Sequence, residues 1–287
     1  MPAKIIIYIL SYNTETYNIS RSIYGQYKWA RFVILPPTIL FENYMYDEWL
    51  INNYDEWKDC DFVGTLAWKA IKKIKLPDID KLADFLEKNN NFDIVPFYVI
   101  DDREYLDYVD IRQPNNKIIL NILFNELKYP KDYIKNNFIE FYCNYWIAKS
   151  NIMLEYINFF KKCKTIINTN EEVQKYIWAY IEYRSEVEED VLNKIFGKKS
   201  YSSHPFVYER IPYLYFNKYN ILHPVISYEN GLYNETLEDY KPPKWPFFAI
   251  WQSFNFYNNF SSDFKKININ HKIKSFKETE MRKILFL

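Results

Sequence analysis

The chain has 287 residues, enough for one large domain or two small ones, and its 48% hydrophobic content supports a sizeable buried core. Its 37 basic and 37 acidic residues cancel, which argues against nucleic-acid binding as the main function, because such binders usually carry a strong basic excess. No run of apolar residues approaches the roughly 18 that a membrane-spanning helix needs, so we expect a cytoplasmic protein without a membrane span.

The first hundred residues alternate between strand-like and helix-like patterns. Four runs rich in β-branched and aromatic residues predict strands at Lys4–Leu10, Arg31–Leu35, Asp61–Leu66 and Phe92–Ile100. Helices are predicted between them at Tyr17–Tyr27, Phe41–Trp57 and Ile79–Asn89. Asp78 is the expected N-cap of the last helix. This alternation favours a mostly parallel α/β sheet flanked by helices.

The second half of the chain is mainly helical in pattern. A further strand is predicted at Phe138–Ile147, and helices are predicted at Asn151–Cys163, Glu171–Phe196 and Lys274–Leu287. Between them, the apolar segment His204–Asn217 carries Glu209 and Arg210 side by side. We therefore expect a mixed sheet that is mostly parallel, with a helical C-terminal part.

The segment Trp57–Ile74 combines acids, a glycine and lysines over a short distance. Asp59 and Asp61 precede the third strand, Gly64 lies within it, and Lys69, Lys72 and Lys73 follow. Carboxylates, a close-approaching backbone and cations together suit a ligand that carries phosphate. The same pattern is also typical of a buried strand between an exposed acidic turn and a solvated lysine face. No glycine-rich dinucleotide fingerprint or P-loop is present, which excludes those nucleotide-binding folds.

The turn after the first strand is a candidate ligand loop. In an open α/β sheet, ligands bind just beyond the carboxyl ends of the strands. Ser11, Tyr12 and Asn13 occupy that position.

Three segments, Trp57–Ile74, Phe141–Phe160 and Pro205–Phe216, resemble the glycosyltransferases of large DNA viruses and of bacterial capsule and lipopolysaccharide gene clusters. The first contains a DxVG strand end, the second an NYWIAK strand that enters a helix, and the third an F-x-x-ER motif. The resemblance extends over about residues 4–220.

The resemblance implies a GT-A-like transferase that moves a sugar from a UDP- or GDP-sugar to a glycan or glycoprotein, such as a viral capsid component. It implies a catalytic domain over residues 1–235, with a donor half at about 1–110 and an acceptor half at about 111–235. Residues 236–287 are expected to form a C-terminal extension packed on the same domain.

Enzymes of this family often hold Mn²⁺ or Mg²⁺ on the donor diphosphate with an Asp-x-Asp motif, and carboxylate oxygens suit those ions. Asp59 and Asp61 are the candidate metal ligands, with Asp61 also expected to be catalytic; Asp78–Asp80 and Asp101–Asp102 are alternatives. Some relatives use cations in place of a metal, and Lys69, Lys72 and Lys73 are the candidates for that role. The cysteines and histidines lack the spacing of a zinc site.

Transfer with inversion also needs a general base for the acceptor hydroxyl. Glu209 is the first candidate and Glu140 a weaker one, although an ion pair between Glu209 and Arg210 would equally explain the former. Tyr12 and Asn13 are expected at the base and ribose of the donor. Asn144, Tyr145 and Trp146 are expected on the acceptor side, where an aromatic face can stack on a sugar, although core packing explains Trp146 as well.

Two other classes of function remain open at this point. One is a catalytically degenerate protein of the same fold that binds sugar or serves a structural role, which the lack of an unambiguous Asp-x-Asp motif supports. The other is a nuclease or nucleotide hydrolase that uses the scattered acids. Stabilisation by a nucleotide sugar with turnover favours the transferase over the degenerate protein, and binding of free glycan without turnover favours the latter.

Overall fold

The computed structural model describes residues 1–97, 99–100, 115–129, 140–179, 181, 189–216, 218–222 and 230–233. The predicted boundary near residue 110, the candidate pair Asp101–Asp102, the extension 236–287 and the predicted helix Lys274–Leu287 lie outside these residues.

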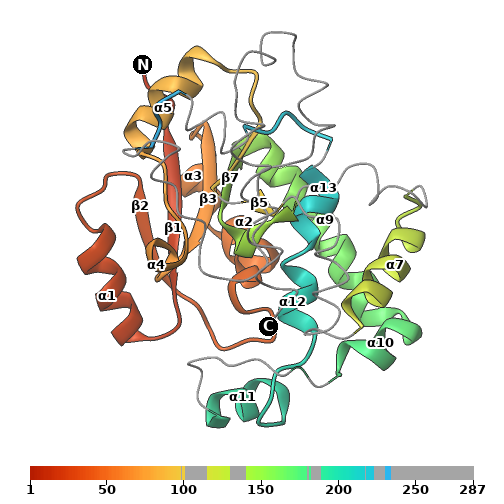
Figure 1. The fold of residues 1–287 in the computed structure, drawn as a ribbon. Helices are drawn as coiled ribbons and strands as arrows, with labels where there is room; N and C mark the ends of the chain where they lie inside the picture. Colours follow the sequence, from red (N-terminus) through yellow and green to blue (C-terminus); the bar gives the residue numbers. More distant parts are fainter. Residues whose placement is uncertain are drawn as a thin grey trace, which may run out of the picture.

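Five strands form one mixed sheet in the order β2-β1-β3-β7-β4 (Figure 1). The strands are β1 (Ile5–Ser11), β2 (Ala30–Ile34), β3 (Phe62–Ala67), β4 (Ile94–Pro96) and β7 (Trp146–Lys149). The first three run parallel, whereas β7 is antiparallel to both of its neighbours, β3 and β4. The expected α/β class with a mixed sheet flanked by helices is therefore confirmed.

The β-branched run at the start of the chain forms the strand that the sequence predicts. All seven residues of β1 and all six of β3 are buried, as continuous apolar strands in a covered sheet should be. Their register pairs Ile7 with Gly64 and Leu10 with Ala67, so both strands end at the same edge of the sheet.

Gly64 allows β3 and β7 to approach closely. A Cβ atom at this position would lie 2.1 Å from the carbonyl oxygen of Trp146 and 2.7 Å from Cγ2 of Ile147. Because backbone atoms in a paired sheet cannot move apart without loss of hydrogen bonds, only glycine fits here. The glycine of the DxVG motif thus serves strand packing in the centre of the sheet.

Helices surround the sheet (Figure 1). They are α1 (Thr14–Tyr24), α2 (Leu50–Asn52), α3 (Tyr54–Trp57), α4 (Ala70–Lys73), α5 (Ile79–Lys88), α7 (Asn116–Glu126), α9 (Ser150–Thr169), α10 (Glu171–Ile177), α11 (Glu189–Phe196), α12 (His204–Tyr208) and α13 (Ile211–Phe216). Asp78 caps α5 as predicted, since its Oδ1 accepts hydrogen bonds from the backbone N–H groups of Asp80 and Lys81.

Three predicted elements are divided in the structure. Phe92–Ile100 forms β4 and then β5 (Val99–Ile100), which pairs with β6 (Glu140–Phe141) in a separate two-stranded sheet. Phe138–Ile147 likewise contains β6, a 3₁₀ turn η3 (Tyr142–Asn144) and the start of β7. The predicted long helix Glu171–Phe196 contains two helices, α10 and α11; α10 ends at Ile177, and Ile181 between them forms a β-bridge with Tyr201.

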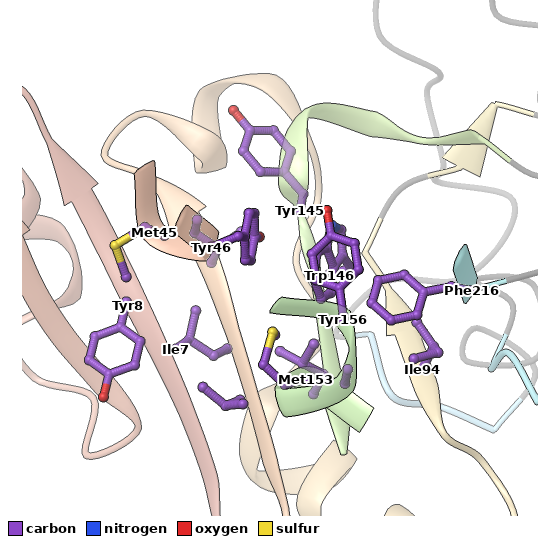
Figure 2. Packing of buried hydrophobic residues seen from close by; sticks show 14 of the residues in the cluster. Ile7, Tyr8, Met45, Tyr46, Ile94, Tyr145, Trp146, Met153, Tyr156 and Phe216 are labelled. Atoms are coloured by element: carbon purple, nitrogen blue, oxygen red, sulfur yellow. The ribbon is translucent and has the colours of Figure 1, made fainter. Parts of the chain in front are cut away.

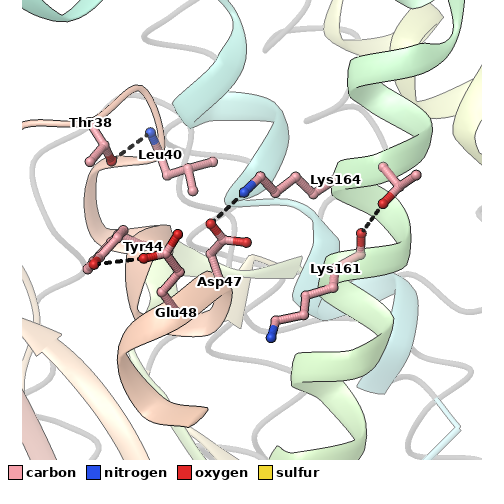
Figure 3. Close-up of polar contacts among 8 residues, drawn as sticks. Thr38, Leu40, Tyr44, Asp47, Glu48, Lys161 and Lys164 are labelled. Carbon is pink, nitrogen blue, oxygen red and sulfur yellow. Dashed lines mark hydrogen bonds and ion pairs between the residues drawn. The ribbon is translucent and has the colours of Figure 1, made fainter. Parts of the chain in front are cut away.

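The predicted helix Phe41–Trp57 is also broken. It consists of a 3₁₀ turn η1 (Phe41–Asn43), a π-helical turn η2 (Met45–Trp49), α2 and α3. Phe41 has a φ of 48°, a left-handed conformation that costs a bulky residue on the order of 1–3 kcal/mol. The π turn is held by the buried Asp47, whose Oδ2 lies 2.5 Å from Nζ of Lys164 on α9 (Figure 3).

Aromatic rings fill the space between the sheet and α9 (Figure 2). Tyr46 stacks on Trp146 with ring centroids 5.3 Å apart, and Tyr156 contacts both rings edge-on, at 5.1 and 5.4 Å. Phe216 of α13 closes the cluster, 4.7 Å from Trp146. Many of the aromatic residues are therefore core residues.

Strand β2 is the end of the sheet in the described part of the chain. Arg31 donates hydrogen bonds from Nη1 to the carbonyl oxygens of Lys28 and Ala30, each at 2.9 Å. Alternation along the strand directs the Ala30 carbonyl away from β1. An outward-facing acceptor of the edge strand is therefore already occupied.

None of the helices in the described residues has the length and apolar character that crossing a bilayer requires.

Candidate functional site

The carboxyl ends of β1, β2 and β3 meet at one edge of the sheet, the lower edge in Figure 1. Tyr12 follows β1 directly, and Lys69 follows β3 by two residues. The turn η1 belongs to the segment that follows β2, and a hydrogen bond from Tyr12 to Glu42 of that turn joins the two. This edge is where the topology of an open α/β sheet predicts a ligand site.

Tyr12 and Glu42 form a direct pair at this edge. The Tyr12 hydroxyl donates a hydrogen bond of 2.8 Å to Oε1 of Glu42, and the Tyr12 ring packs edge-on against Phe41, with centroids 6.2 Å apart. Tyr12 remains 37% exposed and Glu42 is half-buried, so the pair stays in contact with solvent. The left-handed backbone of Phe41 sets the direction in which the next residue, Glu42, leaves the turn.

The charges around this pair come from three separate segments. Burial raises the pKa of Glu42, and the nearby ammonium of Lys73, the hydrogen bond from Tyr12 and the ammonium of Lys69 oppose that rise. The pKa of Tyr12 lies well above its usual value because of burial and the charges of Glu42 and Glu209, with Tyr201 adding to the effect. We call Tyr12, Glu42, Lys69, Lys73 and Glu209 the edge cluster.

The edge cluster combines functions that a transfer reaction needs. Two ammonium groups can bind an anion, and two carboxylates can accept protons or hydroxyl hydrogens. A carboxyl group whose pKa is raised by burial exchanges protons more readily near neutral pH than an exposed one.

A buried pair of amide side chains, Asn43 and Asn144, adjoins the edge cluster through the chain neighbour of Glu42. Asn43, the residue after Glu42, accepts a 3.0 Å hydrogen bond at Oδ1 from Nδ2 of Asn144. The backbone oxygen of Asn144 accepts a further hydrogen bond of 3.1 Å from Oγ1 of Thr65, near the end of β3. The structure thus brings Asn144, predicted as a binding residue, next to the cluster.

Several other predicted ligand residues have structural roles. Ser11 is fully buried and its hydroxyl bonds to Ser20 of α1 at 3.3 Å. The side chain of Asn13 caps α1 by accepting from the backbone N–H of Thr16 at 2.8 Å. Lys72 is exposed and lies 5.8 Å from the ring centroid of Trp68, and it is not among the charges that act on Glu42.

The aromatic residues expected on the acceptor side lie in the core. Tyr145 and Trp146 both have 0% exposure, and Trp146 is enclosed by Tyr46, Tyr156 and Phe216. Trp146 therefore lacks the open face that stacking on a sugar requires, and the alternative of core packing describes it. Glu140 lies in β6, where only the backbone is described.

The acidic pair Asp59 and Asp61 lies at the opposite edge of the sheet, before the start of β3. Oδ2 of Asp61 accepts a 2.6 Å hydrogen bond from the backbone N–H of Lys4, and its own N–H donates to the carbonyl oxygen of Lys4 at 2.9 Å. Strand β3 separates these acids from Lys69 and Lys73, so the structure does not bring the predicted acids and lysines together.

The two acids also do not fit a metal site as the structure stands. Among the described residues, no three His, Cys, Asp or Glu side chains converge in an arrangement suited to a metal ion. Asp61 is engaged with the backbone of Lys4, and the alternative ligand Asp78 is engaged as the cap of α5.

Glu42 is the member of the edge cluster that sequence reasoning missed. It lies in the segment that the spacing of aromatic residues assigned to one continuous helix, in which Glu42 would be an ordinary helix residue. The left-handed backbone of Phe41 breaks the helix and places Glu42 at the edge instead. Glycine and asparagine usually adopt this conformation, so a phenylalanine at this position gives no sign of the break in the sequence. The two prolines Pro36 and Pro37 are the only nearby sign that the chain does not enter a helix at once.

Comparison of the chain with models of known families, with curated proteins and with solved structures finds no match. The likeness to glycosyltransferases therefore stays a prediction from the sequence motifs.

Proposed function

We propose that the chain is a glycosyltransferase of GT-A-like fold that moves a sugar from a UDP- or GDP-sugar to a glycan or glycoprotein acceptor. The observation that carries the proposal is the edge cluster, in which Tyr12 and Glu42 are joined by a 2.8 Å hydrogen bond beyond the carboxyl end of β1. The charges of Lys69 and Lys73 act on Glu42, and that of Glu209 acts on Tyr12. The motifs of Trp57–Ile74, Phe141–Phe160 and Pro205–Phe216 support it from the sequence side.

Lys69 and Lys73 bind the donor diphosphate in this proposal. Glycosyl transfer breaks the bond between the anomeric carbon and the diphosphate oxygen, and negative charge develops on the leaving group. Fixed cations stabilise that charge. Because Asp59 and Asp61 do not fit a metal site here, we derive no step through a metal ion.

Glu209 accepts the proton of the acceptor hydroxyl. In a direct displacement, the hydroxyl oxygen forms the new bond to the anomeric carbon as its proton passes to the carboxylate. Glu42 positions the phenol of Tyr12 through their 2.8 Å hydrogen bond. Burial raises the pKa of Glu42, and an anionic diphosphate nearby raises it further, since a negative charge disfavours the ionised carboxylate.

Calorimetric titration with pyrophosphate, UDP and GDP tests the anion site. We expect Lys73→Met to weaken binding of all three at least tenfold, on the order of 1.4 kcal/mol. Lys72→Met is the matched control, because Lys72 is three residues from Lys69 and exposed but does not act on Glu42. Equal effects of the two variants would contradict the assignment.

Turnover of UDP-glucose and GDP-mannose tests the chemistry. Glu209→Gln should retain donor binding and lose hydrolysis and transfer. A wild-type protein that binds free glycan and none of the nucleotides would instead support the sugar-binding alternative.

A further inference from the structure

The amide of Asn43 has only one possible orientation. Its Nδ2 donates a 3.1 Å hydrogen bond to the carbonyl oxygen of Leu40, which accepts hydrogen bonds and cannot donate them. Oδ1 of Asn43 is therefore the atom that faces Asn144.

The orientation of Asn43 determines that of Asn144. Since Oδ1 of Asn43 is an acceptor, the atom of Asn144 that lies 3.0 Å away must be the donor Nδ2. The other atom of the same amide, Oδ1 of Asn144, has no hydrogen-bond partner within the described residues, although Asn144 is only 1% exposed. An unmet buried acceptor costs about 1–3 kcal/mol.

The backbone holds this oxygen in place at a further cost. Cys143 and Asn144 have φ values of 50° and 59°, so two consecutive residues other than glycine adopt the left-handed conformation. Thr65 fixes the turn by donating from Oγ1 to the backbone oxygen of Asn144, and Oγ1 is itself 2.9 Å from the hydroxyl of Tyr46. Strain of this kind persists where the surrounding structure imposes it, commonly at ligand sites.

The unmet oxygen lies beside the edge cluster. The planar amide that carries it contacts Asn43, the chain neighbour of Glu42. Its backbone contacts Thr65 of β3, which is four residues before Lys69 in the sequence. The edge therefore carries cations that can bind an anion, and the residues adjoining it hold one buried acceptor in a fixed orientation.

We infer that Oδ1 of Asn144 accepts a hydrogen bond from a neutral O–H or N–H group of the nucleotide sugar, either a sugar hydroxyl or a ring N–H of the base. This inference rests on the proposed function and adds a second contact to the same ligand. A carbonyl oxygen repels phosphate and carboxylate oxygens and selects a hydrogen-bond donor. The lysines therefore bind the diphosphate, and the pair Asn43–Asn144 binds a neutral donor group of the sugar or the base. Access requires a shift of the strained turn η3, which the new hydrogen bond favours.

The variant Asn144→Gly tests the inference. Glycine adopts the left-handed conformation without cost, so the backbone is kept while the amide is removed. Cys143→Gly is the matched control, because it makes the same backbone change at the neighbouring left-handed residue and leaves the amide pair intact. Both are titrated with pyrophosphate, UDP, UDP-glucose, GDP and GDP-mannose.

We expect Asn144→Gly to weaken nucleotide-sugar binding roughly tenfold and to leave pyrophosphate binding unchanged, whereas Cys143→Gly changes neither. If UDP or GDP loses as much as its sugar conjugate, the donor group belongs to the nucleoside; if only the conjugate is weakened, it belongs to the sugar. Unchanged nucleotide-sugar binding, or an equal loss for pyrophosphate, overturns the inference.

The outcome also separates this inference from the proposed function. Pyrophosphate binding that depends on Lys73, together with nucleotide-sugar binding that does not depend on Asn144, leaves the proposed function standing and removes the inference. If none of the probes binds the wild-type protein, both fall. A crystal structure of the nucleotide-sugar complex gives a second measurement: a ligand N or O about 2.7–3.2 Å from Oδ1 supports the inference, and a water molecule in that place overturns it.

Discussion

The carboxylates at the two edges of the sheet have different partners. At the edge where β3 begins, Asp61 accepts from the backbone of Lys4, and Asp93 pairs with Lys149 at 2.9 Å. At the edge where β3 ends, burial raises the pKa of Glu42 while Lys69 and Lys73 act against that rise. Asp61 and Asp93 therefore stabilise the fold through their partners, whereas burial makes the ionised form of Glu42 less favourable.

The difference shows why residue type alone does not locate a site. Acids lie near lysines at both edges. At the carboxyl edge the described residues also include the left-handed Phe41, and the adjoining turn holds the left-handed Asn144 with its unmet buried acceptor. Such costs are tolerated at functional positions and are uncommon elsewhere.

The largest expected effect concerns the strand that separates the edges. Gly64→Ala should cost about 4 kcal/mol or more of unfolding free energy, because the new Cβ would meet the backbone oxygen of Trp146 at 2.1 Å. Gly197→Ala is the control: nothing lies within 4 Å of its Cβ position, and only the left-handed φ of 69° makes alanine unfavourable, by about 1 kcal/mol. Urea denaturation measures both, and similar losses would refute the packing role of Gly64.

The ion pair between Asp47 and Lys164 should help to hold the segment that carries Glu42 in its position. Lys164→Met leaves the Asp47 carboxylate buried without its partner and should cost about 2 kcal/mol, less than for a fully buried pair because the Lys164 side chain is 31% exposed. Lys161→Met, three residues earlier on α9, should change stability by less than about 0.5 kcal/mol (Figure 3). Chemical denaturation of both variants measures the difference.

The third prediction concerns the structural edge. Asp61→Ala removes the acceptor of the Lys4 N–H and should cost about 1 kcal/mol of stability while pyrophosphate affinity stays at the wild-type value. Asp59→Ala should change neither quantity. Loss of pyrophosphate binding in Asp61→Ala would contradict the structural role of this edge and would support the prediction that Asp59 and Asp61 bind a metal ion.

The smallest effect should come from Glu42 and should have the opposite sign. A carboxyl with a raised folded-state pKa binds protons more tightly in the folded state, so it lowers stability as the pH rises from the unfolded pKa through the folded one. Glu42→Gln should therefore be more stable than the wild type near neutral pH, by less than about 1 kcal/mol, and this advantage should disappear in acid. Thermal unfolding from pH 4 to pH 7.5 measures the trend; a destabilised variant at neutral pH would show that the bond to Tyr12 outweighs burial.

The sequence predicted those parts of the fold that depend on local pattern. Strands β1, β2 and β3 follow from apolar β-branched runs, and α5 follows from the Asp78 cap, because each is determined by neighbouring residues. The break of the segment Phe41–Trp57 depends on tertiary partners such as Lys164 on α9, more than a hundred residues away. The helical spacing of aromatic residues within Phe41–Trp57 carries no information about a partner as distant in the sequence as Lys164.

The sequence predicted the place of the edge cluster in the sheet better than it predicted which residues form the cluster. The rule for carboxyl ends of strands pointed to Tyr12, and the local pattern of Trp57–Ile74 pointed to Lys69 and Lys73, which follow β3. Gly64 suggested a backbone that approaches a phosphate-bearing ligand, because its actual neighbour, Trp146, is 82 residues later and does not appear in a local pattern. Glu42 was missed for the related reason that its surroundings arise only in the folded chain.

The guanidinium of Arg31 has a consequence for how copies of this protein meet one another. An open strand edge invites a second chain to extend the sheet, and this is a common route to aggregation. With the Lys28 and Ala30 carbonyls already occupied, an incoming strand would have to displace Arg31 before it could pair at the start of β2. The Arg31 side chain therefore obstructs this route of self-association at the start of the strand that ends the sheet among the described residues.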